Sequence, residues 1–354
     1  MASGDIPKTM RAAVLVKFQS KPGYQVKEIP VPEVGPNDVL IKIGAAGFCH
    51  TDYQVWEGVY ESPLPQVPSH EPVGTVVAVG KDAIGKWKVG DRVGALLHRH
   101  KCGHCLPCEV TNDVRFCENA DLAGLKADGG MAEYMIGDAD QTLRLPDSVD
   151  FVQGAPLMCA GTTVWAGIEA TKVAPGEPIG IIGIGGLGSL AVQFAKALGH
   201  PVVAVDNRNE GRELATALTL KADLVVSPDD PDVISKIKKW AGKGGLPSLV
   251  GCTDNVEVNK WAMKLLRPKG GVFVPLGLPV DGFKIPAFDL VFQQSTVVGS
   301  LVSNRAQAQA MLDCVAKHGI RSWITEIPLE RAPELPTLYM DAHLKGRLVV
   351  NMAL

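Results

Sequence analysis

The sequence predicts an α/β protein with a β-rich domain and a second domain built on a doubly wound parallel sheet. Its 354 residues exceed the size that one hydrophobic core usually serves, so we expect two domains. The first part of the chain alternates polar and apolar residues with a period of two, which is typical of strands. From about residue 161, short apolar strands alternate with helical patterns. That alternation indicates a parallel sheet covered by helices on both faces.

The expected elements follow in order along the chain. In the β-rich part, turn residues separate strands predicted at 12–17, 25–29, 39–43, 74–79 and 91–95. In the second part we expect strands at 179–182, 202–205, 223–226 and 271–276, with helices over 187–198 and 256–266. A last strand is predicted at 347–352. Periodicity alone does not show which domain this tail joins.

Charge and hydropathy argue against two kinds of partner. A formal net charge of −3 gives no basic field that would attract nucleic acid. No apolar run approaches the roughly eighteen residues that a membrane span needs. The start of the chain, Met1 to Lys8, is polar and contains no apolar signal segment. We therefore expect a cytoplasmic protein without a membrane partner.

Four of the eight cysteines lie in one short segment, Cys102-x2-Cys105-x2-Cys108-x8-Cys117. They could form disulfides in a secreted protein, but a reducing compartment favours thiolates on a tetrahedral zinc. The residues between them contain no long apolar stretch, so a metal would supply the ordering energy of this lobe. A closed four-thiolate site leaves no open position for chemistry. We therefore look for catalysis elsewhere.

A glycine-rich turn, Gly183-x-Gly185-x-x-Gly188, directly follows the strand at 179–182 and opens the next helix. In this context the turn predicts a dinucleotide site, with the pyrophosphate at the helix N-terminus; the alternative is a turn in a domain that binds nothing. Asp206 ends the next strand, where a carboxylate can accept hydrogen bonds from the ribose and repel a 2′-phosphate. This favours NAD over NADP, although Arg208 and Arg212 lie nearby.

Three further residues could bind a second metal. Cys49, His70 and Cys159 together would give a catalytic zinc three protein ligands and an open fourth position. Each could instead be an ordinary buried thiol or core histidine. Sequence distance does not show that the three converge.

Taken together, these motifs resemble the zinc-dependent medium-chain alcohol dehydrogenases over nearly the whole chain. The matching segments are, in order, Cys49-His50-Thr51-Asp52, His70-Glu71-x-x-Gly74, Gly90-Asp91-Arg92-Val93-Gly94, the four-cysteine segment, Cys159-Ala160-Gly161 and the turn Gly183-x-Gly185-Gly186-Leu187-Gly188. The stretches 157–163 and 185–193 look most like the yeast and fungal type.

The resemblance implies a GroES-like catalytic domain of residues 1–158 and 297–354, with a zinc lobe at 98–120. It also implies a Rossmann domain of residues 159–296 that binds NAD. Each chain would hold two zinc ions, and four chains would form a homotetramer. The implied reaction is reversible oxidation of a primary alcohol to an aldehyde: zinc lowers the pKa of the alcohol hydroxyl, and NAD takes the hydride.

The resemblance also assigns roles at the site. Cys49, His70 and Cys159 would bind the catalytic zinc, and Glu71 would be an alternative ligand. Asp52 would orient His70, and Thr51 would take the hydroxyl proton. The expected cofactor contacts, besides the turn, are His50, Asp206, Arg212 and Arg347.

The sequence departs from the family's pattern at three places, and its expected substrate pocket differs as well. The spacing between Cys108 and Cys117 is one residue longer than usual, Ser69 replaces a glycine, and Gln54 replaces the histidine that ends the proton relay. The expected pocket residues are Tyr60, Leu97 and Leu278. Tyr60 and Leu97 stand where yeast-type enzymes have tryptophans, so we expect bulkier alcohols than ethanol.

Two other functions remain open from the sequence. The chain could be a polyol or secondary-alcohol dehydrogenase of the same superfamily. It could also be a nucleotide-binding protein with a structural or regulatory role. The retained Cys49, His70, Cys159 and Thr51 argue against the second alternative, because a structural protein needs no open metal site.

Overall fold

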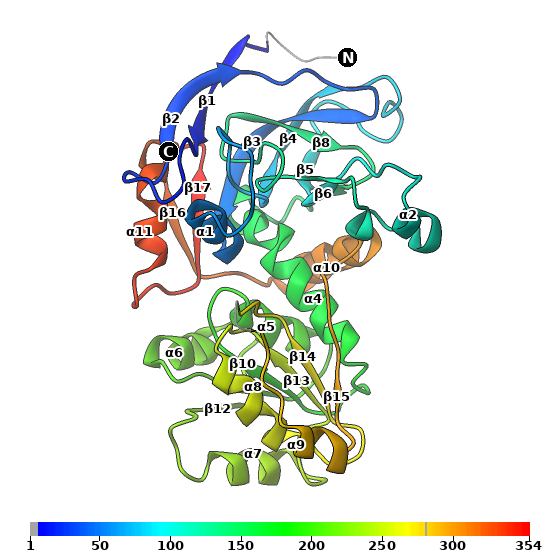
Figure 1. Ribbon diagram of the computed structural model, residues 1–354, viewed down its shortest axis with the longest axis vertical. Helices are drawn as coiled ribbons and strands as arrows, with labels where there is room; N and C mark the ends of the chain where they lie inside the picture. The colour runs from blue at the N-terminus through cyan, green and yellow to red at the C-terminus, as the bar shows by residue number, and fades with distance from the viewer. Residues whose placement is uncertain (1–5, 280–281) are drawn as a thin grey trace. The chain divides into compact units, whose positions relative to one another are not determined.

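The computed structural model describes residues 6–279 and 282–354, which form two compact units (Figure 1). The first unit runs to Cys159 and also takes Asn304–Ala316 and Ile324–Leu354. The second comprises Ala160–Ser303 and Lys317–Trp323. The first five residues of the polar N-terminal segment lie outside the described residues. Within the described ranges no helix combines the length and the apolar character that a membrane span needs.

The first unit is built on a seven-stranded sheet in the order β16-β17-β3-β4-β5-β9, with β8 also paired to β3. The C-terminal strand β17 runs antiparallel to β3, so the tail is part of this unit. A separate antiparallel pair joins β1 and β2. The strands are β1 (Thr9–Val14), β2 (Gln25–Pro30), β3 (Asp38–Phe48), β4 (Pro72–Val79), β5 (Arg92–Ala95), β8 (Tyr134–Asp138), β9 (Thr142–Arg144), β16 (Ile324–Ile327) and β17 (Arg347–Asn351).

Short helices and the cysteine lobe complete this unit. Alternate residues of β4 are buried, as expected for a strand with one face on a core. The helical segments are α1 (His50–Glu57), α2 (Leu106–Thr111), η1 (Val114–Phe116), α3 (Phe151–Gly154), η2 (Ala155–Met158), α10 (Arg305–His318, whose last residues belong to the second unit), η4 (Leu329–Glu334) and α11 (Leu335–Tyr339). In the lobe, β6 (His98–Arg99) pairs with β7 (Asp121–Leu122).

The second unit has a six-stranded parallel sheet in the order β12-β11-β10-β13-β14-β15. Chain order reverses on either side of β10, and in such sheets ligands bind beyond the strand ends at this switch point. The elements are α4 (Ala160–Ala170), β10 (Ile179–Ile182), α5 (Gly188–Ala197), β11 (Val202–Val205), α6 (Asn209–Ala217), β12 (Leu224–Val226), α7 (Val233–Ala241), β13 (Ser248–Gly251), α8 (Val256–Ala262), η3 (Met263–Leu265), β14 (Val272–Pro275), α9 (Ala287–Phe292) and β15 (Thr296–Val297).

Candidate active site and cofactor-binding turn

The candidate active site starts where β3 ends and α1 begins. Cys49 is the N-cap of α1, and its Sγ accepts a hydrogen bond from the Thr51 N–H at 3.3 Å. In return, the Asp52 carboxylate accepts the Cys49 N–H at 2.9 Å. This reciprocal capping satisfies two backbone donors that a helix start leaves free. It also holds the Cys49 sulfur at a defined position.

Four possible metal ligands converge in the first unit: Cys49, His70, Glu71 and Cys159. Their ligand atoms all lie within 4.8 Å of one another, and Cys49 Sγ is 3.3 Å from His70 Nε2. Because zinc bonds to sulfur and nitrogen are about 2.0–2.3 Å long, such spacings suit one tetrahedral ion. The donor set and its geometry therefore fit a catalytic zinc. Asp52 Oδ1 lies 3.3 Å from His70 Nδ1, on the ring nitrogen away from Cys49.

The charges around this cluster favour a thiolate at Cys49. Burial raises the pKa of the Cys49 thiol, but hydrogen bonding from Cys159 and the charge of His70 lower the pKa well below its ordinary value. Burial lowers the pKa of His70, yet the negative charges of Cys49 and Asp52 raise it well above normal. Zinc binds cysteine as thiolate, so the local charge already suits a metal ligand at Cys49.

Glu71 is fully buried behind these ligands and forms an ion pair with the buried Arg347 through Oε1. Its Oε2 has no hydrogen-bond partner among the described residues. Burial raises the pKa of Glu71 to about 7, and the positive charge of Arg347 opposes that rise. An unpaired buried carboxylate oxygen beside three metal ligands is consistent with the expected alternative ligand. The expected contact of Arg347 with a pyrophosphate remains a prediction.

Three further candidate residues, His50, Thr51 and Gln54, lie in α1. Thr51 and His50 are half-buried, and His50 Nδ1 lies 3.2 Å from the Tyr339 hydroxyl. No sequence signal pointed to Tyr339, because it lies 289 residues from His50 in the chain. Gln54 is buried, and its Oε1 accepts a hydrogen bond from the Tyr60 hydroxyl at 3.1 Å. The side chain that stands in place of the relay histidine is therefore hydrogen-bonded to Tyr60.

The expected pocket residues do not all lie in the same unit. Tyr60 and Leu97 are partly buried and pack against the hydrophobic core of the first unit. Leu278 belongs to the second unit and is 64% exposed. The structure therefore brings Tyr60 and Leu97 to one core, whereas the role of Leu278 remains a prediction.

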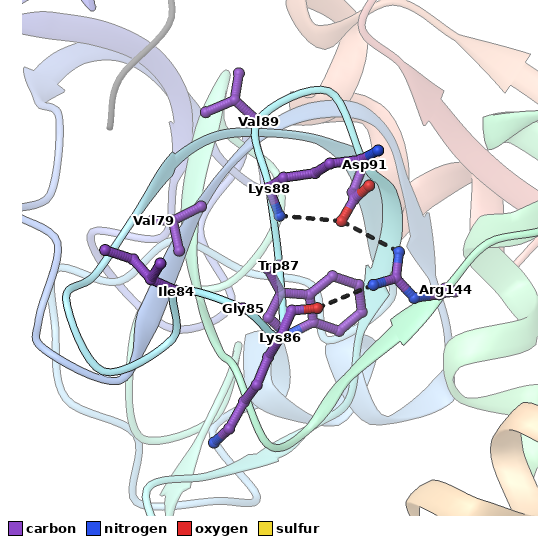
Figure 2. A pocket seen from close by; sticks show the side chains of 9 residues that line it. All are labelled: Val79, Ile84, Gly85, Lys86, Trp87, Lys88, Val89, Asp91 and Arg144. Atoms are coloured by element: carbon purple, nitrogen blue, oxygen red, sulfur yellow. Dashed lines mark hydrogen bonds and ion pairs between the residues drawn. The ribbon is translucent and has the colours of Figure 1, made fainter.

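A surface hollow of about 660 Å³ in the first unit is lined by the loop before β5 and by Arg144 (Figure 2). None of the four clustered ligands lines it. Arg144 lies over the Trp87 ring, 4.7 Å from its centroid, and pairs with Asp91 at 3.1 Å. These contacts brace the loop before β5. The hollow is therefore bounded by this loop and by Arg144, and it does not include the candidate metal ligands.

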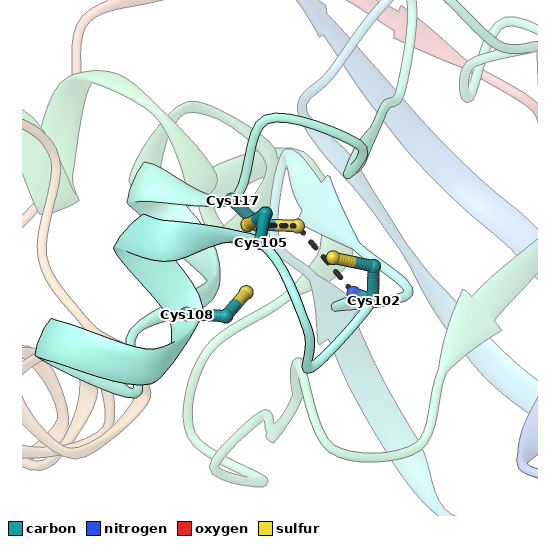
Figure 3. Close-up of side chains that lie close together, drawn as sticks. All are labelled: Cys102, Cys105, Cys108 and Cys117. Atoms are coloured by element: carbon teal, nitrogen blue, oxygen red, sulfur yellow. Dashed lines mark hydrogen bonds between the residues drawn. The ribbon is translucent and has the colours of Figure 1, made fainter.

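The four cysteines of the lobe face a common space (Figure 3). Their sulfurs lie within 4.8 Å of one another, and those of Cys105 and Cys117 are 4.0 Å apart. None of the eight cysteines forms a disulfide bond, so the disulfide alternative does not hold in this structure. Hydrogen bonds from the His104 N–H and the Asn119 amide lower the pKa of Cys102 to about 5. The grouping fits a four-thiolate zinc site despite the longer spacing before Cys117.

The glycine turn lies at the switch point of the second unit, between β10 and α5. Gly183 has φ +84°, which a residue with a side chain adopts only with strain. A Cβ on Gly188 would lie 2.0 Å from the Gly183 carbonyl oxygen, so this glycine permits strand and helix to pack. A Cβ on Gly185 would meet only Arg208, at 3.7 Å. Internal packing thus does not explain Gly185, whereas a closely approaching ligand would.

Asp206 is buried at the end of β11 and braces this turn. Its Oδ2 accepts the Ile184 N–H at 2.6 Å, and its Oδ1 accepts the Arg208 N–H at 2.8 Å. Arg212 donates to the backbone carbonyls of Asp206 and Asn207, so its guanidinium is held against the loop. The Arg208 side chain is 40% exposed, and its Nε lies 3.5 Å from Asp206 Oδ1. Arg208 is thus better placed than Arg212 to reach a 2′-phosphate.

Comparison with known proteins identifies the family. A model described as "Alcohol dehydrogenase GroES-like domain" matches residues 35–147, and one described as "Zinc-binding dehydrogenase" matches residues 186–317. An alcohol dehydrogenase from Geobacillus stearothermophilus is 38% identical over 345 residues, which is 97% of this chain and 100% of that protein. The chain therefore belongs to the zinc-type medium-chain alcohol dehydrogenase family. Further relatives at 36% identity are also bacterial, so the comparisons do not support the yeast and fungal type.

Solved structures agree on the fold, which is the expected GroES-like plus Rossmann α/β architecture. A zinc-binding dehydrogenase from Sinorhizobium meliloti bound to NADP is 28% identical with a TM-score of 0.86, covering 98% of this chain and all of that one. The acetophenone reductase from Geotrichum candidum in complex with NAD is 26% identical with a TM-score of 0.83, covering 98% of both chains. The two similar structures therefore contain different cofactors.

Proposed function

We propose that this chain is an NAD-dependent zinc alcohol dehydrogenase that interconverts primary alcohols and aldehydes. One observation carries the proposal: Cys49, His70 and Cys159 converge beside Thr51, with the unpaired oxygen of Glu71 behind them. The names of the relatives support the same reaction class. We further propose two zinc ions per chain, one in this cluster and one in the four-cysteine lobe.

The residues of the site divide the work as follows. Cys49, His70 and Cys159 would hold zinc, which when bound lowers the pKa of an alcohol hydroxyl toward neutrality. The half-buried Thr51 hydroxyl accepts the proton of the alcohol and donates its own onward. Asp52 holds the His70 ring through Nδ1 and caps the Cys49 amide, so that both ligands keep their orientation. The nicotinamide ring supplies the acceptor for the hydride.

Substrate size follows from Tyr60 and Leu97. The Tyr60 hydroxyl is bonded to Gln54, which fixes the ring, and Leu97 offers an aliphatic surface where a larger ring would fill space. We therefore propose longer, branched or aromatic primary alcohols as substrates. Each buried methylene contributes about 0.8 kcal/mol, so two or three added carbons would favour the larger substrate by roughly tenfold or more if the contacts persist in the transition state.

NAD is the proposed cofactor because the buried Asp206 carboxylate lies beside the turn and would repel a 2′-phosphate. We also propose a cytoplasmic location, since a reducing compartment keeps cysteines out of disulfide bonds and none of the eight forms one here. A homotetramer is proposed from the family resemblance. The exposed apolar side chains Phe288, Val291 and Phe292 of α9 in the second unit support self-association.

One experiment tests this function directly. Zinc is counted in the purified protein, and NAD reduction is followed with ethanol, hexanol, benzyl alcohol, cinnamyl alcohol, 2-butanol and sorbitol. We expect two zinc ions and the highest kcat/KM with the larger primary alcohols. Higher kcat/KM with 2-butanol or sorbitol would instead assign a secondary-alcohol or polyol dehydrogenase. Zinc without turnover of any alcohol would indicate a structural or regulatory protein.

A further inference from the structure

Ser69 lies directly before His70 and Glu71 and has an unusual backbone conformation. Its φ of +78° is in the left-handed region, which glycine adopts freely and serine only with strain. The residue is completely buried, so its hydroxyl needs partners within the protein. A serine retained under these conditions requires interactions that offset the strain.

The Ser69 hydroxyl bridges two segments of the zinc cluster. It donates to the Gly47 carbonyl at 2.7 Å and accepts the Glu71 N–H at 3.2 Å. Gly47 is in β3, two residues before Cys49, and Glu71 follows the ligand His70. The Ser69 N–H donates to Asp52 Oδ1 at 3.0 Å, the same oxygen that lies beside His70. Ser69 therefore contacts the segments that carry three of the four clustered ligands.

The Glu71 side chain has little freedom in this arrangement. A Cβ on Gly47 would lie 1.8 Å from Glu71 Oε2, so only glycine leaves room for the carboxylate. On the other side, Glu71 Oε1 is paired with Arg347. The Gly47 N–H donates to the Glu71 carbonyl at 3.2 Å, and the hydroxyl bridge adds a second link that fixes the distance between Gly47 and the Glu71 backbone. It thereby fixes the direction in which Oε2 faces the other ligands.

We propose that Ser69 is a positioning residue: its hydroxyl clamps the Gly47 carbonyl to the Glu71 amide and so holds His70 and Glu71 in place for the metal. The proposal rests on the proposed function for the identity of that metal as zinc. Ser69 acts through its neighbours and touches neither substrate nor cofactor. Without the clamp, the His70–Glu71 segment gains freedom, and zinc escapes from this cluster more readily.

The test compares zinc release from the wild-type holoenzyme and from the Ser69→Ala and Ser69→Gly variants into a colorimetric chelator. Ser69→Ala keeps the strained Cβ and loses the hydroxyl, so we expect release from this cluster to be about tenfold to a hundredfold faster, as for other residues that support metal ligands. Ser69→Gly also loses the hydroxyl but removes the strain, so its rate of zinc release should lie between those of Ser69→Ala and wild type. Release from Cys49→Ser identifies which kinetic phase belongs to the cluster.

Ser303→Ala is the matched control. Ser303 is also buried, and its hydroxyl donates to a backbone carbonyl, that of Thr162, at 2.8 Å in the second unit. The Ser303→Ala variant should leave both kinetic phases of zinc release unchanged. Equal acceleration of the cluster and the four-cysteine lobe in Ser69→Ala would show general destabilisation and overturn the proposal, as would unchanged release in both Ser69 variants.

A metal-independent readout separates this proposal from the proposed function. Amide hydrogen exchange at Glu71 is measured in the metal-free wild-type and Ser69→Ala proteins, because the clamp protects that N–H directly. We expect faster exchange in the variant, and equal exchange would overturn the clamp. If the wild-type cluster bound no zinc, the proposed function would fail, while faster exchange in Ser69→Ala would still support the clamp.

Discussion

Asp206 combines two roles at the residue scale, because the carboxylate that braces the glycine turn is also the group proposed to contact the cofactor. We expect Asp206→Ala to lower kcat/KM for NAD by about tenfold or more, since hydrogen bonds to a charged group contribute roughly 1.5–3 kcal/mol. The ratio of kcat/KM for NAD to that for NADP should fall, because Arg208 then lacks its counter-charge. Initial rates with both cofactors measure this ratio.

Asp223→Asn provides a control in the same unit. The Asp223 carboxylate also accepts a strand N–H, that of Val202 at 2.7 Å, and it pairs with Lys196 rather than facing the turn. This variant should keep the wild-type cofactor ratio. A wild-type preference for NADP would show that Arg208 outweighs the carboxylate and would refute the NAD assignment.

Glu177 gives the second unit a measurable pH dependence. The hydrogen bond from Arg267, at 2.8 Å, and the nearby Lys243 lower the pKa of this carboxyl on folding. A lowered folded-state pKa stabilises the protein above the unfolded value of 4.5, and this contribution is lost as pH falls through the folded-state pKa. Glu177→Gln should cost about 0.5–1.5 kcal/mol of unfolding free energy at pH 7.

Denaturant titrations of wild type and Glu177→Gln at a series of pH values test this sign. The difference between the two proteins should shrink as the pH falls below 4.5. Glu257→Gln is the comparison, because the Glu257–Lys284 pair is exposed and 3.8 Å apart and should contribute nothing measurable. A difference that grew in acid would contradict the direction of the pKa shift.

At the scale of elements, we expect the cysteine lobe to depend on the proposed zinc. Its helices α2 and η1 have six and three residues, too few to be stable alone. Cys102→Ser should therefore lose one zinc per chain and lower the thermal midpoint of the protein. Metal analysis and calorimetry test this together.

Cys252→Ser, at a half-buried thiol outside both clusters, should keep both zinc ions. Full zinc content in Cys102→Ser would rule out the four-thiolate site.

Some elements were predictable because their signals are local. The strand at Ile179–Ile182 agrees with β10, and the following helix starts within one residue of its prediction, since apolar period and glycine turn coincide there. The four-residue strand β13 and helix α4 were not predicted. Their short or continuously apolar segments carry no clear period, and burial on both faces gives strand and helix the same pattern.

The site was harder to predict than the elements, because it depends on distant contacts. Motif order suggested that Cys49, His70 and Cys159 act together, but only the fold shows that they converge. The Glu71–Arg347 ion pair spans 276 residues and arises because β17 pairs with β3. No local pattern encodes such a pairing, so sequence reasoning identified the chemistry of these residues and not their partners.

On the scale of the whole molecule, the second unit has a face suited to a second copy of the chain. No residue of α9 is buried: Phe288, Val291 and Phe292 are 66–73% exposed, and the two phenyl rings stack 4.2 Å apart. The neighbouring strand β15 pairs only with β14, so the backbone groups of its other edge lack strand partners among the described residues. Apolar side chains beside an open sheet edge favour association with an identical edge.

We therefore expect Phe288→Glu combined with Val291→Glu to reduce the molecular mass measured by light scattering from that of a tetramer to a smaller species. Charges introduced on an apolar interface are costly to bury, whereas they cost nothing on a free surface. Ile84→Lys is the control, because Ile84 is similarly exposed, at 60%, but belongs to the first unit. This variant should keep the wild-type mass. A monomeric wild-type protein would refute the tetramer. An unchanged mass in the double variant would place the contacts between subunits elsewhere, because two like copies of α9 could not bury these charges without loss of association.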